Sequence, residues 1–168
     1  MEGNNDRPIC LITGITGYLG SHCCLAALQD GTFKIRGSVR DPNNQKKMQP
    51  IKDAFGDLYN DLELAKMDLL DEAAIDKAIE GCTYVIHTAS PFPLEEPKDE
   101  NLLIKPAVEG TLAVMRAARK HKVKRVVITS SVVSVQVSKD RTKKHFSEAD
   151  WTDLTVAMGY AKSKTMAE

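Results

Sequence analysis

Short apolar runs alternate with segments of helical spacing along the whole chain, and this alternation constrains the fold more than any other feature. The runs expected to form strands are ICLIT, FKIRGSV, LELAKMDL, CTYVIHTA and VKRVVITSS. Continuous apolar runs of this kind are typical of strands that are buried on both faces. Strands that alternate with helices favour a parallel sheet covered on both sides. The sequence therefore predicts an α/β protein with a Rossmann-type, doubly wound parallel sheet and helices on both faces.

The segments between the runs carry helix start and stop signals. The first, LGSHCCLAALQD, ends at Gly31, a residue type that commonly follows a helix. Further helices are expected over 46–56, 71–81 and 99–121, with a last helix beginning near Tyr160. Because proline lacks an N–H group, we expect the second helix to begin near Pro50 and the long one to start or kink near Pro106.

Composition indicates the class of protein and its partners. The 168 residues suit a single domain over 1–168, and Lys+Arg and Asp+Glu are equal at 23 each. That balance gives no reason to expect nucleic acid or a membrane surface as a partner. The four cysteines form no C-x-x-C pair, so we expect reduced, mostly buried thiols and no metal site. Without a leader or a spanning run, the expected location is cytoplasmic.

Three glycines follow the first strand at intervals of three, in the stretch TGITGYLG. Gly14, Gly17 and Gly20 lie where a strand turns into a helix, the setting that a dinucleotide site requires. Glycine permits the tight turn and a close approach of the backbone to a pyrophosphate, which the N–H groups at the helix start then bind. The alternative is a strand–helix turn without a ligand, but the placement favours dinucleotide binding.

The end of the second strand, SVRD, bears on which dinucleotide is bound. An acidic residue at this place accepts the ribose 2′-hydroxyl of NAD, whereas an arginine accommodates the 2′-phosphate of NADP. Arg40 lies there, and Lys46 and Lys47 follow. A guanidinium and an ammonium suit a phosphate dianion, although Asp41 is adjacent. We therefore favour NADP as the cofactor, with NAD as the less favoured alternative.

The stretch YAKSK places Tyr160 and Lys164 four residues apart, on one face of the predicted helix. A phenol titrates near pH 10, and a nearby ammonium ion lowers that pKa, so the tyrosine could deliver a proton to a carbonyl oxygen. The fifth strand ends in Thr129–Ser130–Ser131, whose hydroxyls could donate to a developing alkoxide. The alternatives are a surface Tyr–Lys pair and a serine that only caps a turn.

Together, the stretches TGITGYLG, SVRDPNNQKK, MDLLD, HTASPF, KPAVEGTL, VVITSS and YAKSKTMAE make the chain similar to the extended short-chain dehydrogenase/reductases. It resembles most of all their dihydroflavonol reductase, cinnamoyl-CoA reductase and aldehyde/ketone reductase branch. The resemblance implies a catalytic triad of Ser131, Tyr160 and Lys164. It also implies cofactor contacts, which include Tyr160 and Lys164, from Gly14, Thr16, Gly17, Tyr18, Leu19, Gly20, Arg40, Lys47, Asp68, Leu69, Thr88, Ala89 and Ser90.

The same resemblance implies an NADP-dependent reduction of a small-molecule aldehyde or ketone. The oligomeric state stays open. Relatives often carry asparagine where this chain has Glu109. Whether the long helix makes the supporting hydrogen bond of that asparagine is therefore an open question. Family members continue beyond the tyrosine helix, so we expect the chain to lack the C-terminal strands and the substrate lobe and to bind cofactor with little turnover. Two other functions stay open: an epimerase, dehydratase or 3β-hydroxysteroid dehydrogenase, and an NADP(H)-binding sensor without catalysis.

Overall fold

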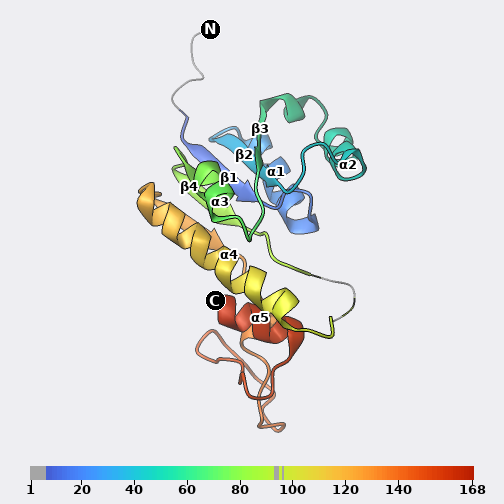
Figure 1. Ribbon diagram of the computed structural model, residues 1–168, viewed down its shortest axis with the longest axis vertical. Helices are drawn as coiled ribbons and strands as arrows, with labels where there is room; N and C mark the ends of the chain where they lie inside the picture. The colour runs from blue at the N-terminus through green and yellow to red at the C-terminus, as the bar shows by residue number, and fades with distance from the viewer. Residues whose placement is uncertain (1–6, 93–94, 96) are drawn as a thin grey trace.

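Five parallel strands form one sheet in the order β3-β2-β1-β4-β5 (Figure 1). The computed structural model describes residues 7–92, 95 and 97–168. The strands are β1 (Ile9–Thr13), β2 (Lys34–Val39), β3 (Leu62–Lys66), β4 (Tyr84–His87) and β5 (Arg125–Ile128). The central strand β1 pairs with both neighbours, so that Ile12 lies opposite Gly37 of β2 and Thr13 opposite His87 of β4. The predicted parallel sheet is thereby confirmed.

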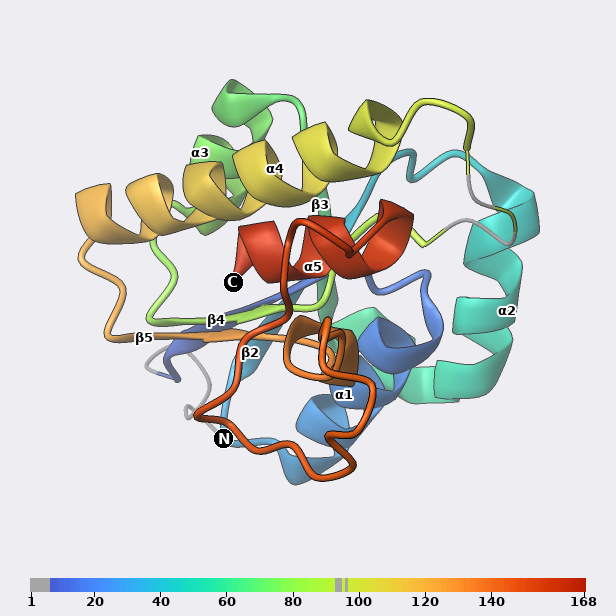
Figure 2. The ribbon, with the colours of Figure 1, turned by 90° about the horizontal axis from the view of Figure 1, so that it is seen from below.

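Helices cover both faces of this sheet (Figure 2). They are α1 (Tyr18–Asp30), α2 (Gln45–Phe55), α3 (Glu72–Ile79), α4 (Asn101–Lys120) and α5 (Gly159–Ala167), with short 3-10 turns η1 (Gly56–Asp61) and η2 (Val132–Ser134). Alternate residues of β1 enter two separate cores. Cys10 and Ile12 pack with side chains of α1 and α2, whereas Leu11 packs with side chains of α3 and α4. The doubly wound arrangement is therefore confirmed by packing as well as by strand order.

The predicted start of the second helix near Pro50 is wrong, and so is the alternative that the long helix starts near Pro106, whereas the predicted range 99–121 agrees with α4. Helix α2 begins at Gln45 and α4 at Asn101, so that Pro50 and Pro106 lie inside their helices. The side chain of Asn44 accepts a backbone N–H from the first turn of α2 and fixes its start ahead of the proline. Each proline removes one N–H group from its helix, a loss that the packing of the helix on the sheet offsets.

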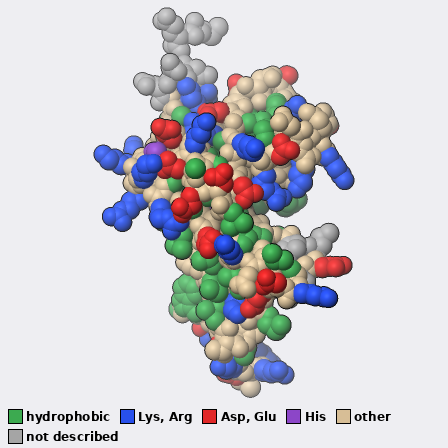
Figure 3. Space-filling view, in the orientation of Figure 1, with side chains coloured by type: hydrophobic (Ala, Val, Ile, Leu, Met, Phe, Trp, Pro, Cys, Tyr) green, Lys and Arg blue, Asp and Glu red, His purple; other side chains and the backbone are tan. Residues whose placement is uncertain are grey.

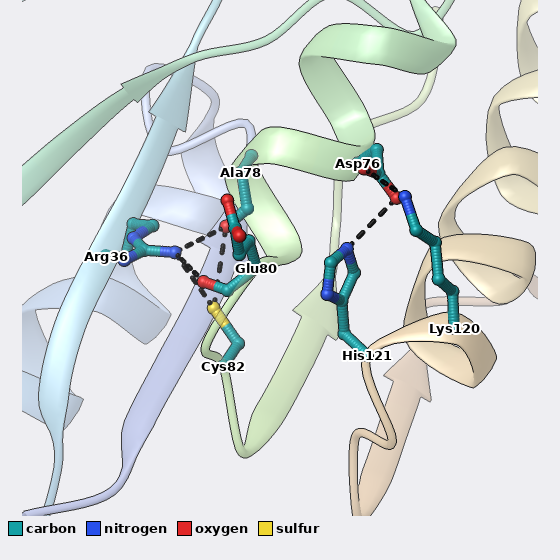
Figure 4. Close-up of polar contacts among 7 residues, drawn as sticks. All are labelled: Arg36, Asp76, Ala78, Glu80, Cys82, Lys120 and His121. Atoms are coloured by element: carbon teal, nitrogen blue, oxygen red, sulfur yellow. Dashed lines mark hydrogen bonds and ion pairs between the residues drawn. The ribbon is translucent and has the colours of Figure 1, made fainter.

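Two sets of polar contacts hold α3 against its neighbours (Figure 4). The guanidinium of Arg36, on β2, donates to the carbonyl oxygens of Ala78 and Glu80 at 2.8 and 2.7 Å, and so caps the C-terminus of α3. On the other side of α3, the ammonium of Lys120 donates to the carboxylate of Asp76 at 2.7 Å. These contacts tie α3 both to the sheet and to the end of α4.

All four cysteines are free thiols, as expected (Cys10, Cys23, Cys24 and Cys82). Burial raises the pKa of Cys10 to about 11 and that of Cys24 to about 12, so both stay protonated and pack as small apolar groups. Among the described residues, no group of acidic, histidine and cysteine side chains is arranged to hold a metal ion. No helix in the described part of the chain is long and apolar enough to cross a membrane.

Charged side chains of both signs are interspersed over the upper half of the face in Figure 3. Hydrophobic side chains gather in its lower half, where α4 and α5 lie. The interspersed charges agree with the equal numbers of acidic and basic residues and give this face no single-sign field.

Candidate active site

The glycine turn between β1 and α1 is too tight for side chains at two of its three glycines. Gly14 has φ +71°, a conformation that L side chains rarely adopt, and a Cβ there would lie 3.0 Å from that of Ala89. A Cβ at Gly20 would lie 2.5 Å from the carbonyl oxygen of Gly14. Gly17 is the N-cap of α1 and brings no side chain to the first N–H groups of that helix. These groups therefore remain open to an anion.

The other residues predicted on this turn lie at or near its surface. Tyr18 is 84% exposed and Leu19 45% exposed, while Thr16 is half-buried. The backbone N–H of Gly14 donates to the hydroxyl of Ser38 at 3.1 Å, a contact from β2 that sequence reasoning missed. The hydrogen bond to Ser38 thus ties the turn to β2, while Tyr18 and Leu19 are exposed to solvent.

The residues predicted to contact the adenosine end follow β2 and β3. Arg40 and Lys47 are both exposed. The carboxylate of Asp41 accepts the backbone N–H of Asn43 at 2.9 Å and so shapes the turn that follows Arg40. Farther along, Asp68 accepts a backbone N–H within its own turn, and Leu69 is half-buried, with side-chain atoms close to the backbone of α4.

A single hydroxyl organises the residues after β4. The Oγ1 atom of Thr13 accepts the backbone N–H groups of Thr88 and Ala89, each at 3.0 Å. The hydroxyl of Thr88 donates in turn to the carbonyl oxygen of Thr13. Thr88, Ala89 and Ser90 are the cofactor contacts predicted after β4. The hydroxyl of Thr88 is therefore hydrogen-bonded within the protein, and Ala89 packs against Gly14. Ser90 lines a cavity.

The same hydroxyl sets the state of His87, a buried residue that sequence reasoning did not single out. Thr13 Oγ1 accepts the two N–H groups with its lone pairs, so its O–H donates a hydrogen bond to His87 Nδ1, which lies 2.9 Å away. His87 therefore carries its proton on Nε2 and is neutral. Burial, and secondarily the charge of Lys164, lowers the pKa of His87 to about 4.

Helix α5 brings Lys164 into the interior and leaves Tyr160 half-buried. The ammonium of Lys164 donates to the carbonyl oxygen of Thr129 at 2.6 Å, directly after β5. Only 7% of Lys164 is exposed, and burial lowers its pKa while the charge of Glu168 acts in the opposite direction. The ring of Tyr160 packs edge to face with that of Phe92, with centroids 5.1 Å apart.

A contact from α4 anchors the start of α5. The carboxylate of Glu100, just before α4, accepts from the ammonium of Lys162 at 2.6 Å and from the backbone N–H of Gly159. These two contacts, the contact with Lys162 first, lower the pKa of Glu100. Because the N-cap residue Met158 provides no side-chain acceptor, Glu100 supplies the cap from a distant part of the chain.

The ends of β4 and β5 meet α4 and α5 around a cavity of about 190 Å³. Its lining residues are His87, Ala89, Ser90, Thr111, Ile128, Thr129, Ser130, Lys164, Ala167 and Glu168. Lys164 is the member of the predicted triad among them. Ser131 lies outside this lining, and its Oγ accepts the backbone N–H of Val133 at 3.4 Å, which caps η2. The adjacent Ser130 faces the cavity instead.

Three of the lining residues carry polar side chains that sequence reasoning missed, although each had a signal. His87 is the last residue of β4, Thr111 is a hydroxyl at a buried position of α4, and Glu168 follows Lys164 by one helical turn. Glu109, where the sequence left a supporting hydrogen bond open, is exposed on α4. The buried polar residue that α4 brings to the cavity is Thr111.

The chain is similar to known proteins over nearly its whole length. A family model described as the NAD dependent epimerase/dehydratase family matches residues 10–168. The chain is 36% identical over 174 residues to the bifunctional dihydroflavonol 4-reductase/flavanone 4-reductase of Malus domestica, covering 99% of this chain and 49% of that protein. It is 41% identical over 170 residues to dihydroflavonol 4-reductase of Arabidopsis thaliana, covering 96% of this chain and 44% of that protein.

Solved structures of reductases have the same fold. Yeast methylglyoxal/isovaleraldehyde reductase Gre2 complexed with NADPH has a TM-score of 0.75 at 26% identity, over 95% of this chain and 50% of that one. Vestitone reductase from alfalfa, Medicago sativa, has a TM-score of 0.74 at 30% identity, over 95% of this chain and 49% of that one. The chain spans about half the length of the curated relatives it matches. Since the family model matches nearly the whole sequence, the chain belongs to the NAD dependent epimerase/dehydratase family.

Proposed function

We propose that the protein is an NADP-dependent oxidoreductase that reduces an aldehyde or ketone to an alcohol, with residues 1–168 as its dinucleotide-binding domain. The observation that carries this proposal is the placement of α5. This helix presents Tyr160 and, one turn later, a buried ammonium ion at the carboxyl end of β5. Ligands of open parallel sheets bind at the carboxyl ends of the strands. Reductases among the relatives support the same reading.

The residues of the glycine turn fit a dinucleotide. The α1 N-terminus offers N–H groups that no side chain caps, and the space beside Gly14 and Gly20 admits no Cβ. The pyrophosphate would rest on this turn, and Arg40 with Lys47 would hold the 2′-phosphate. Because Arg40 and Lys47 are exposed and can reach a ligand, the 2′-phosphate of NADP is favoured over the 2′-hydroxyl of NAD. The bound dinucleotide would supply the hydride.

Tyr160 would act as the general acid in this proposal. Its phenol gives a proton to the carbonyl oxygen of the substrate, and the hydroxyl of Ser131 donates a hydrogen bond to the same oxygen. The ammonium of Lys164 lies one helical turn from the phenol and favours the phenolate that remains. Lys164 is held in place by the Thr129 carbonyl oxygen.

Two measurements test the proposal in order. Calorimetric titration of the chain with NADPH and with NADH should show tighter binding of NADPH. Turnover of aldehydes and ketones by the protein that contains this sequence is then followed through nicotinamide absorbance, for wild type and for Tyr160→Phe. We expect the variant to bind NADPH normally and to lose most of its turnover, by roughly 100-fold or more. Unchanged turnover in Tyr160→Phe would show that another group supplies the proton.

The same measurements separate the two other functions. An epimerase or dehydratase of this family would retain NAD through purification and return it to the oxidised state, so NADPH would not be consumed in stoichiometric amounts. A sensor would bind NADPH and turn over no carbonyl compound. The combination of Tyr160 and a buried Lys164 argues against the sensor, since binding alone needs no acid.

A further inference from the structure

The cavity beneath α5 is lined by a carboxylate as well as by the buried ammonium. Glu168 follows Lys164 by four residues, so both project from one face of α5, and both line the cavity. The hydroxyl of Ser130 donates to Oε2 of Glu168. From this arrangement we infer that Glu168 is a positioning residue whose carboxylate stabilises the ammonium form of Lys164, and that Ser130 holds the Glu168 carboxylate in place.

Lys164 needs such a partner because its surroundings oppose its charge. It is 7% exposed, and burial lowers its pKa. An ammonium has three N–H bonds, and the Thr129 carbonyl oxygen accepts one of them. A carbonyl is neutral, whereas the Glu168 carboxylate brings a full negative charge that raises the pKa of Lys164. In the proposed reaction only the charged form of Lys164 favours the phenolate of Tyr160.

Among the side chains described around the cavity, Lys164 and Glu168 are the ones that carry charge. The titratable side chains in the described lining are His87, Lys164 and Glu168. His87 is neutral because burial lowers its pKa to about 4, and its Nδ1 accepts a hydrogen bond from the Thr13 hydroxyl. Helix α4, which packs against α5, contributes the uncharged Thr111 to the lining. The carboxylate of Glu100, just before α4, is engaged with Lys162 at the other end of α5.

The inference also assigns different roles to the neighbouring residues Ser130 and Ser131. Ser130 faces the cavity and donates to Glu168. Ser131 lies outside the cavity lining, caps η2 through its Oγ, and is the serine proposed to act on the substrate oxygen. Replacing Ser130 should therefore lower the pKa of Lys164, whereas replacing Ser131 should alter turnover and leave that pKa unchanged.

The test is a pH titration of the Lys164 side chain by NMR, on protein with 13C-labelled lysine and without cofactor. The Lys164→Arg variant assigns the signal. We expect Glu168→Gln to lower the pKa of Lys164 by roughly 0.1 to 0.4 unit, the effect of one partly screened charge at this spacing. Ser130→Ala should lower it in the same direction and by less. Glu109→Gln, which removes a charge from the exposed face of α4, is the matched control and should leave the signal in place.

An unchanged Lys164 titration in both Glu168→Gln and Ser130→Ala would overturn the inference, as would an equal shift in Glu109→Gln. The role of Lys164 in catalysis rests on the proposed function, but this titration needs neither cofactor nor substrate. If the pKa of Lys164 shifts in Glu168→Gln but the protein has no reductase activity, the proposed function is rejected and the interaction of Glu168 with Lys164 stands. Where turnover is present, its pH profile should move with the NMR value in Glu168→Gln, which a merely structural role of Glu168 would not produce.

Discussion

Thr13 shows how much of the site depends on one small side chain. Its hydroxyl accepts two backbone N–H groups after β4 and donates to His87, so it fixes both the path of the chain and the tautomer of the histidine. Thr13 is fully buried, and the sequence marks it only as the last residue of a strand. The effect on His87 could not be predicted, because the two residues are brought together by the pairing of β1 with β4.

Stability should fall with acid because of His87. Its pKa is lowered from 6.5 to about 4 in the folded protein, so between these values the unfolded chain binds more protons. The contribution is fully present above pH 6.5 and is lost as the pH falls to 4, and it amounts to about 3 kcal/mol. Urea unfolding of wild type and His87→Asn at several pH values measures it. The variant should lose this part of the pH dependence.

An exposed histidine provides the control for that experiment. His22→Asn should keep the wild-type pH dependence, because its ring lies on the surface of α1. The explanation is wrong if His87→Asn and His22→Asn change the pH dependence equally.

Arg40 should determine the preference for NADPH. A charged hydrogen bond to the 2′-phosphate contributes about 1.5–3 kcal/mol, so Arg40→Ala should weaken NADPH binding by roughly 10- to 100-fold. NADH lacks this phosphate, and its affinity should change little. Calorimetry with both dinucleotides measures the ratio, with Arg119→Ala, an exposed arginine in the last turn of α4, as the control. Equal losses for NADPH and NADH would show that Arg40 does not contact the phosphate.

At the scale of elements, the sequence predicted which segments form strands and helices better than it predicted where helices begin and how the chain turns between elements. The apolar runs located all five strands, because burial on both faces leaves a clear pattern. Pro50 misplaced the start of α2, because Asn44 caps this helix upstream of the proline, whereas the predicted range of the long helix agrees with α4. The choice between Ser130 and Ser131 depends on how η2 turns after β5, and no pattern in the chain describes that turn.

The hydrogen bonds by which Arg36 caps α3 should contribute more to the unfolding free energy than the ion pair of Arg36 with Glu63. Arg36→Met removes the donor for the carbonyl oxygens of Ala78 and Glu80, and we expect a loss of about 1–3 kcal/mol of unfolding free energy. Glu63→Gln removes only the ion pair, whose glutamate side chain is 56% exposed, and should cost less than about 1 kcal/mol. Urea unfolding compares the two. Equal losses would mean that the ion pair, and not the cap, stabilises the end of α3.

At the scale of the whole molecule, the cavity depends on contacts between distant segments. Its lining comes from the ends of β4 and β5, from α4 and from α5. Helix α5 reaches this place because Glu100 holds its first turn and Lys164 reaches the end of β5. The sequence predicted the sheet and the residues of α5. The position of α5 follows from two contacts between distant residues, that of Lys162 with Glu100 beside α4 and that of Lys164 with the Thr129 carbonyl oxygen after β5.

Because β1 belongs to both cores, the two faces of the sheet should unfold together. Leu11 and Ile12 are both fully buried, one in the core under α3 and α4 and the other in the core under α1 and α2. Leu11→Ala and Ile12→Ala should each cost about 2–5 kcal/mol, whereas Val127→Ala, at a position that is 52% exposed on β5, should cost less than about 1 kcal/mol.

The measurement is a urea titration followed separately through amide NMR signals of α1 and of α4. If β1 couples the two cores, both sets of signals have one midpoint in wild type, and in each variant that common midpoint moves to lower urea. Had the cores been independent, Leu11→Ala would shift only the α4 signals and Ile12→Ala only the α1 signals. A common shift would mean that the glycine turn, which joins β1 to α1, and the cavity beneath α5 gain and lose their structure together, since the same strand supports both.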